Sequence, residues 1–92
     1  MKVVINNSYG KFSVSKEFLE HYSLPFSMRY EVSRYDQRLI EYIETYGSEA
    51  ASGFSADLVV VNIPAGTFYR IREYDGLESI EYRDSICWLV AD

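Results

Sequence analysis

Polar and apolar residues alternate along the segments on both sides of Asp75-Gly76. Successive side chains of a strand point to opposite faces, and Asp-Gly is favoured in a type I′ turn because both central residues take positive φ. The pattern therefore predicts a β-hairpin with a two-residue turn. This turn sets a register that pairs Tyr74–Leu77, Glu73–Glu78, Arg72–Ser79, Ile71–Ile80, Arg70–Glu81, Tyr69–Tyr82 and Phe68–Arg83.

The two faces of this hairpin differ in composition. One face is predicted to be core because it carries apolar and aromatic residues: Tyr69, Ile71, Ile80 and Tyr82. The other mixes aromatic residues with arginines: Phe68, Arg70, Arg72, Tyr74, Leu77, Glu81 and Arg83. Glu73 and Glu78 share the first face at the turn end. Directly opposed like charges are destabilising, and this penalty is small in water, so we expect both glutamates to be solvated. The alternative is that they hold a cation or an arginine of a partner.

Apolar runs predict further strands over residues 2–6, 58–63 and 86–90. The run at 58–63 is unbroken, so we expect that strand to be buried on both faces in the middle of a sheet. Residues 26–35 alternate less clearly and fit either a short strand or an ordered loop.

Helical spacing of apolar residues predicts two helices, over residues 16–22 and 37–46. Ser15 and Asp36 precede them as N-cap residues, whose side chains accept a hydrogen bond from the first turn. Gly47 stands where a helix commonly ends in a left-handed residue.

The order β-α-α-β-β-β-β in 92 residues predicts one α+β domain spanning residues 1–92. We expect a mixed, mainly antiparallel sheet of about five strands with the two helices packed on one face. The strands at 2–6 and 58–63 are expected to pair in parallel through a right-handed helical crossover, and the later strands to form an antiparallel meander. An open edge strand favours pairing with a second copy, as a homodimer or higher homo-oligomer.

The net charge of −5 and the pI near 4.8 weigh against binding to the nucleic-acid backbone, which needs clustered Lys and Arg. Acidic mimicry of nucleic acid is compatible with this charge, although the 14 acidic residues are spread along the chain. The single cysteine, Cys87, excludes an internal disulfide. The apolar runs are too short to cross a membrane, so we expect a cytoplasmic protein.

No catalytic constellation is found in the sequence. His21 has no acid or nucleophile placed beside it, and the loop at residues 6–13 lacks the Gly-Lys-Ser/Thr of a phosphate-binding loop. We therefore predict no enzymatic activity, no catalytic residue, no metal site and no cofactor. A small hydrolase is a remote alternative.

Tyrosine and arginine recur close together, as Tyr30, Tyr35, Tyr69, Tyr74 and Tyr82 near Arg29, Arg34, Arg70, Arg72 and Arg83. Aromatic faces stack on bases, and guanidinium groups grip phosphates. We predict a surface that holds a small nucleotide, with a set of ligand-binding residues comprising Tyr9, Lys11, Arg70, Arg72 and Tyr74. The alternatives are a protein–protein surface, where Tyr and Arg dominate hot spots, and a purely structural sheet face with pairs such as Arg70–Glu81.

Several motifs resemble those of a family of small uncharacterised proteins of bacteriophages and prophages. Residues 9–15 (Tyr-Gly-Lys-Phe-Ser-Val-Ser) are similar to its Tyr-Gly-Gly-Phe-Ser-Leu-Ser motif, with Lys11 in place of the second glycine. Residues 47–53 resemble its Gly-x-Glu-Ala-Ser-Gly connector, and Ile63-Pro64 resembles the end of its apolar strand. Residues 73–78 match its Glu-Tyr-Asp-Gly-x-Glu motif.

The resemblance implies an accessory phage protein, and such proteins often inhibit host functions or host defence. We therefore predict a non-enzymatic binding protein that acts in the host cytoplasm by sequestering a nucleotide signal. The alternative is an inhibitor that binds a host or defence protein, by acidic mimicry of nucleic acid among other means.

Overall fold

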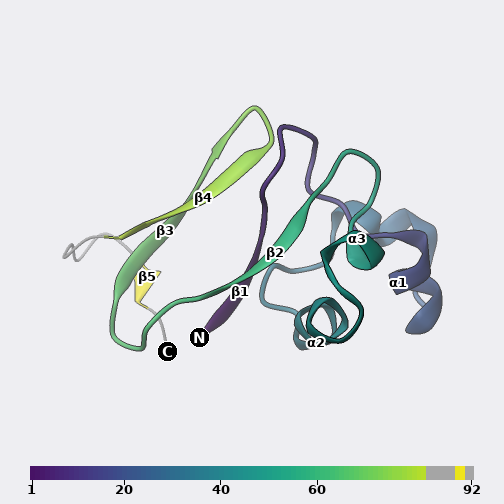
Figure 1. Ribbon diagram of the computed structural model, residues 1–92, viewed down its shortest axis with the longest axis horizontal. Coiled ribbons are helices and arrows are strands. Elements are labelled where there is room, and N and C mark those ends of the chain that lie inside the picture. The colour runs from purple at the N-terminus through teal and green to yellow at the C-terminus, as the bar shows by residue number, and fades with distance from the viewer. Residues whose placement is uncertain (83–88, 91–92) are drawn as a thin grey trace.

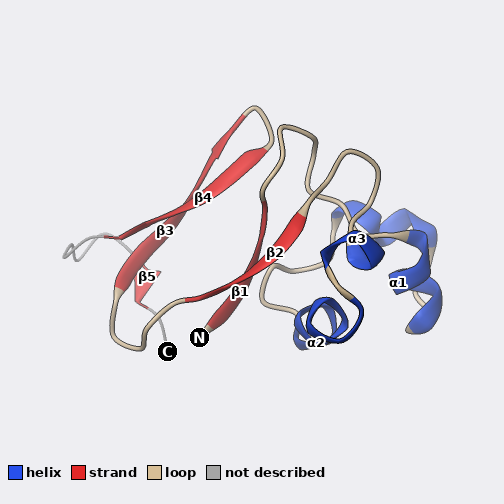
Figure 2. Cartoon of the chain, in the orientation of Figure 1, coloured by secondary structure: helices blue, strands red, loops and turns tan. Residues whose placement is uncertain are grey.

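The computed structural model describes residues 1–82 and 89–90, and within them helices gather at one end and a hairpin lies at the other (Figure 1). The strands are β1 (Lys2–Asn6), β2 (Leu58–Asn62), β3 (Phe68–Tyr74), β4 (Leu77–Tyr82) and β5 (Leu89–Val90). The helices are α1 (Lys16–His21), α2 (Gln37–Tyr46), α3 (Ser48–Ala51) and the 3-10 helix η1 (Phe26–Tyr30). The β1–β2 pair lies between the helices and the hairpin (Figure 2).

The α+β class is confirmed, but the single five-stranded sheet is wrong. In the described part of the chain, β1 and β2 form one sheet, and β4, β3 and β5 form another in that order. The pairing of β1 with β2 is antiparallel, with Asn6 opposite Leu58, so the expected parallel crossover is also wrong. The physical reason lies at the end of β1, where the Asn6 side chain accepts a hydrogen bond from the Asp57 N–H at 2.9 Å. This contact starts β2 beside the end of β1, and the two strands therefore run in opposite directions.

The hairpin register is confirmed for the six pairs from Tyr69–Tyr82 to Tyr74–Leu77. Asp75 and Gly76 have φ of 52° and 92°, as the type I′ turn requires. The seventh predicted pair includes Arg83, which lies outside the described residues. The predicted strand at 86–90 is described only at β5, which pairs with β3.

The helix caps follow the prediction. Ser15 Oγ accepts a hydrogen bond from the Phe18 N–H at 3.1 Å, and Asp36 Oδ1 accepts one from the Arg38 N–H at 2.8 Å. Residues 26–35 are neither a strand nor a plain loop, because η1 occupies their first half. Pro25, with φ of −68°, precedes η1, and its carbonyl accepts from the Met28 N–H at 3.0 Å.

β1, and not β2, is the more deeply buried strand. Val3 and Val4 are fully buried because they face two different cores, whereas the three valines of β2 are partly exposed. Val4 belongs to the main core under the helices, which contains Phe12, Val14, Phe18, Leu19, Val32, Leu39, Ile40, Tyr42, Ile43, Ala51 and Leu58. Val3 belongs to a smaller core with Ile63 and Tyr69.

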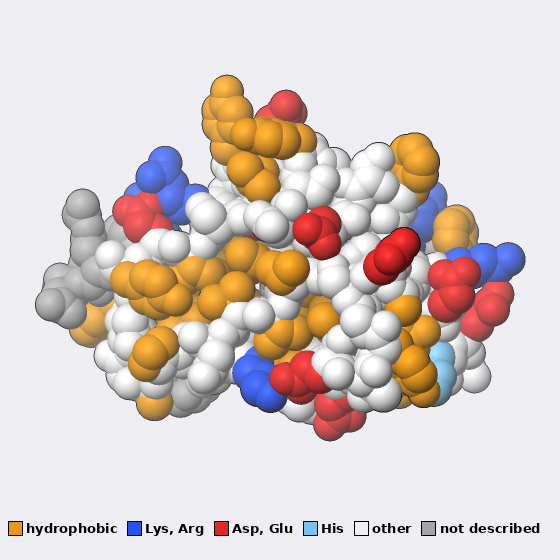
Figure 3. All heavy atoms as spheres, viewed as in Figure 1, with side chains coloured by type: hydrophobic (Ala, Val, Ile, Leu, Met, Phe, Trp, Pro, Cys, Tyr) orange, Lys and Arg blue, Asp and Glu red, His pale blue; other side chains and the backbone are white. Residues whose placement is uncertain are grey.

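The predicted core face of the hairpin is only partly buried. Tyr69 is buried, Ile71 and Ile80 are half-buried, and Tyr82 is exposed. Apolar side chains accordingly remain visible over the strands in the space-filling view (Figure 3). The smaller core is therefore a thin layer between the hairpin and β1.

Asn6 is fully buried and joins three segments that are distant in sequence. Its Nδ2 group donates to the carbonyls of Ser8 (3.2 Å), Gly10 (2.5 Å) and Gly76 (3.0 Å), and its Oδ1 accepts from Asp57. The hairpin turn packs so closely on the loop after β1 that a Cβ on Gly76 would overlap the carbonyl of Gly10. One amide thus fixes where the hairpin meets the rest of the chain.

We expect Asn6→Ala to destabilise the protein by about 3 kcal/mol, because it leaves buried carbonyls and one N–H without partners. For a domain of this size the melting temperature should fall by roughly 10–20 °C. Thermal and urea unfolding followed by circular dichroism measure the change. Asn7→Ala is the matched control, since Asn7 is exposed. Equal stability of the two variants would contradict the role given to Asn6.

Candidate functional site

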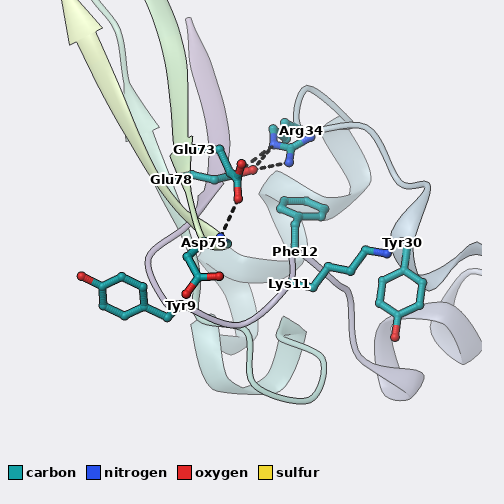
Figure 4. A pocket seen from close by; sticks show the side chains of 9 residues that line it. Tyr9, Lys11, Phe12, Tyr30, Arg34, Glu73, Asp75 and Glu78 are labelled. Atoms are coloured by element: carbon teal, nitrogen blue, oxygen red, sulfur yellow. Dashed lines mark hydrogen bonds and ion pairs between the residues drawn. The ribbon is translucent and has the colours of Figure 1, made fainter.

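A groove of about 530 Å³, here called the hairpin groove, opens between the hairpin turn, the loop after β1 and η1 (Figure 4). Its charged lining residues are Lys11, Arg34, Glu73, Asp75 and Glu78. In Figure 4 the Lys11 amine points toward Tyr30, whereas the ring of Tyr9 points away from both.

Glu78 is buried, with an exposed fraction of only 4%. Arg34 Nε lies 3.0 Å from both oxygens of its carboxylate, and Arg34 Nη2 forms an ion pair with Oε2. The carboxylate also accepts the N–H of Asn6 at 2.9 Å, on the edge of β1 that faces away from β2. The Arg34 guanidinium is stacked 4.4 Å from the ring centre of Phe12.

The expectation that Glu73 and Glu78 are both solvated is therefore wrong for Glu78. Glu73 is exposed and accepts the Gly76 N–H at 2.5 Å, which stabilises the turn. Glu78 points to the β1 side and is neutralised by an arginine of the same chain. This neutralisation explains why two directly opposed glutamates are tolerated.

The hairpin groove is not suited to phosphate. Its lining includes two cations and three carboxylates, a formal charge of −1. Arg34 is already bonded to Glu78, and Glu73 and Asp75 stand at the rim as exposed carboxylates. A phosphate entering this groove would meet net repulsion.

A second groove, of about 490 Å³, is here called the basic groove and shares Lys11 and Tyr30 with the first. Its charged lining residues are Lys11, Lys16, Arg29 and Glu17, a formal charge of +2 on a chain of net charge −5. Its aromatic lining residues are Phe26, Tyr30 and Phe54. Cationic and aromatic groups therefore meet at one place on an acidic protein.

The 3-10 geometry of η1 produces part of this arrangement. Residues three apart lie on the same side of a 3-10 helix, so Arg29 returns over Phe26. Arg29 Cζ lies 4.4 Å from the ring centre of Phe26 and 4.6 Å from that of Tyr30. Lys11 Nζ approaches the same Tyr30 ring to 4.3 Å. Cation–π contacts of this kind position a cation without neutralising it.

The structure brings together only some of the predicted ligand-binding residues. Tyr9 and Lys11 line the hairpin groove, and Lys11 also lines the basic groove. Arg70, Arg72 and Tyr74 lie on the opposite, outward face of the hairpin and line neither groove. Side-chain alternation causes this separation. Glu73 points into the hairpin groove, so its neighbours Arg72 and Tyr74 point to the opposite face of the hairpin.

The arginines of the outward face interact with one glutamate. Arg70 Nη2 lies 3.4 Å from Glu81 Oε1, and Arg72 Nη1 lies 3.0 Å from Glu81 Oε2. Desolvation raises the pKa of the Glu81 carboxyl, but the hydrogen bonds and charges of Arg72 and Arg70 outweigh it and hold that pKa below its usual range. The predicted Arg70–Glu81 pair is thus present, and a ligand role for this face stays a prediction.

Sequence reasoning did not single out Lys16, Phe26 or Phe54 as site residues. The Phe-x-x-Arg spacing after Pro25 was the available signal for η1. For Phe54 the signal was one large apolar residue inside a small, polar connector.

The described residues contain no group of three or more His, Cys, Asp or Glu side chains that could hold a metal ion. His21 lines neither groove and packs in an aromatic cluster with Tyr22, Tyr42 and Tyr46, at ring-centre distances of 4.7, 5.4 and 6.0 Å. None of the helices in the described ranges is long and apolar enough to cross a membrane.

No protein family, curated protein or solved structure matches this chain. The resemblance to phage proteins therefore stays a prediction. Its two most specific motifs do meet in space, because the carbonyls of Tyr9 and Gly10 lie against Gly76. Their contact is one of backbone packing.

Glu78→Gln should destabilise the protein by about 2 kcal/mol, because it leaves Arg34 without its buried counter-charge. Urea unfolding provides the measurement. Glu73→Gln is the matched control on the same face and should change stability by less than about 0.5 kcal/mol. A loss of equal size in both variants would show that the Arg34–Glu78 pair adds nothing specific.

Proposed function

We propose that this chain is a non-enzymatic binding protein that sequesters a small nucleotide in the basic groove. The observation that carries the proposal concerns the cations. Of the eight Lys and Arg side chains in residues 1–82, six lie within ion-pair distance of a carboxylate. The two that have no such partner among the described residues, Lys11 and Arg29, both stack on Tyr30.

Unpaired cations held on an aromatic ring are suited to an anionic ligand. A phosphate meeting Arg34 or Arg72 would have to displace a carboxylate, whereas Lys11 and Arg29 keep their charge available. The ring of Tyr30 orders both side chains beforehand, which reduces the entropy lost on binding. Charge-assisted hydrogen bonds to phosphate are also stronger than neutral ones.

A nucleotide is favoured over a bare anion by the aromatic lining of the groove. Bases stack on aromatic side chains, and this stacking tolerates different bases. Tight binding alone would remove a nucleotide from solution, and no catalytic group is needed for it. Action against a host function or host defence in the cytoplasm is the biological role we propose, and the motif resemblance supports it.

Binding to a host or defence protein is the second candidate function. The outward face of the hairpin favours it, because Tyr74 is 77% exposed there and lies on the same face as Arg70 and Arg72. Tyr and Arg are enriched among residues that dominate protein–protein binding energy. The Arg70→Ala, Arg72→Ala double variant tests this face by itself, because it changes no residue that lines the basic groove.

A thermal-shift screen against linear and cyclic nucleotides, followed by calorimetry, tests the first candidate. A nucleotide at a hundred times its dissociation constant adds about 2.7 kcal/mol, and the melting temperature should rise by roughly 10 °C or more. Arg29→Ala should weaken that binding about 10- to 100-fold, because it removes charged hydrogen bonds to phosphate. Lys11→Ala should act in the same direction.

The Arg70→Ala, Arg72→Ala double variant is the matched control and should bind the nucleotide as the wild type does. A screen in which no nucleotide shifts the melting temperature would contradict the proposal. A loss of binding in the double variant with none in Arg29→Ala would move the site to the outward face of the hairpin.

A further inference from the structure

Phe54 is the most exposed large apolar side chain in the described residues, with an exposed fraction of 96%. It lies in the connection between α3 and β2 and lines the basic groove together with Lys11 and Arg29. One exposed apolar residue is common on protein surfaces. The backbone that presents Phe54 is what distinguishes it.

Phe54 and Ser55 are the central residues of a tight turn, closed by a hydrogen bond from the Ala56 N–H to the Gly53 carbonyl at 3.1 Å. Ser55 has φ of 63°, in the left-handed region. A turn with positive φ at its third residue favours Gly or Asn there, so Ser55 holds a conformation that its side chain disfavours. Such conformations persist where the surroundings impose them, and they are frequent at binding sites.

Contacts on both sides of the turn impose this conformation. The Gly53 N–H donates to the Ser13 carbonyl at 3.0 Å, and the Ser8 hydroxyl donates to the Ser55 carbonyl at 2.8 Å. A Cβ on Gly10 would overlap the Ser55 carbonyl, and a Cβ on Gly53 would overlap the Ser13 side chain. The turn is therefore fixed against the loop after β1, which also carries Lys11.

We infer that Phe54 is the stacking platform for the base of the ligand, while Lys11 and Arg29 hold its phosphate. This inference rests on the proposed nucleotide binding and adds which residues contact the base and which contact the phosphate. The ligand class is then a base joined to at least one phosphate, rather than an inorganic polyphosphate or a sugar phosphate.

The chemistry of phenylalanine also limits the specificity. Phe54 has no polar atom in its side chain, so it cannot read the hydrogen-bonding edge of a base. Discrimination between bases at this position rests on stacking area alone, and purines should bind more tightly than pyrimidines. Broad base tolerance with a purine preference is therefore the expected profile.

The test compares three ligands by calorimetry on the intact protein: a purine nucleoside diphosphate, its nucleoside and inorganic pyrophosphate. The nucleotide should bind the wild type at least about fivefold more tightly than pyrophosphate, because the base contributes by stacking. Phe54→Ala should weaken nucleotide binding at least about fivefold and leave pyrophosphate binding unchanged. Phe54→Trp should retain nucleotide binding, since it keeps the aromatic surface.

Because Phe54 is almost fully exposed, Phe54→Ala should melt at the wild-type temperature without ligand, which checks that the fold is intact. Tyr74→Ala is the matched control, an exposed aromatic outside the groove that should bind as the wild type does. If Phe54→Ala binds the nucleotide as the wild type does while Arg29→Ala does not, the inference is overturned and nucleotide binding stands. Equal affinity of the wild type for pyrophosphate and nucleotide overturns it too, and binding of no nucleotide overturns both.

Discussion

The buried amide of Asn6 is the constraint on which the rest of the structure depends. A buried side-chain amide is costly unless its hydrogen-bonding groups find partners. Asn6 finds them in three separate segments: the loop after β1, the residue before β2 and the hairpin turn. Together with the Asn6 N–H bonded to Glu78, these contacts attach the hairpin to β1 although no strand ladder joins them. β1 lies between two cores, the main one under the helices and the smaller one toward the hairpin.

The same junction accounts for two short glycine motifs of the sequence. A Cβ on Gly10 would overlap the Ser55 carbonyl, and a Cβ on Gly76 would overlap the Gly10 carbonyl. The Tyr-Gly and Asp-Gly motifs are therefore accounted for by backbone packing, without any ligand. Two residues of the basic groove lie beside this junction. Lys11 follows Gly10, and the strained turn at Ser55 presents Phe54.

Charge pairing concentrates a positive surface on an acidic chain. Most cations in residues 1–82 are matched by nearby carboxylates, so their fields cancel at short range. Lys11 and Arg29 are held by the ring of Tyr30, which fixes their position and leaves their charge uncancelled. The basic groove is therefore attractive to anions although the net charge of the protein would repel them.

The sequence by itself determined the features that depend on neighbours in the chain. The Asp75-Gly76 turn, the hairpin register and the caps at Ser15 and Asp36 follow from local dihedral preferences and short-range hydrogen bonds. Only the tertiary structure decided the direction of β2, the burial of Glu78 and the joining of Lys11, Arg29 and Phe54 in one groove. Each of these rests on contacts between distant residues, such as Asn6 with Asp57, 51 positions apart, and Arg34 with Glu78, 44 apart. An alternating pattern shows which side chains share a face, but which face meets a buried partner depends on where the rest of the chain folds back.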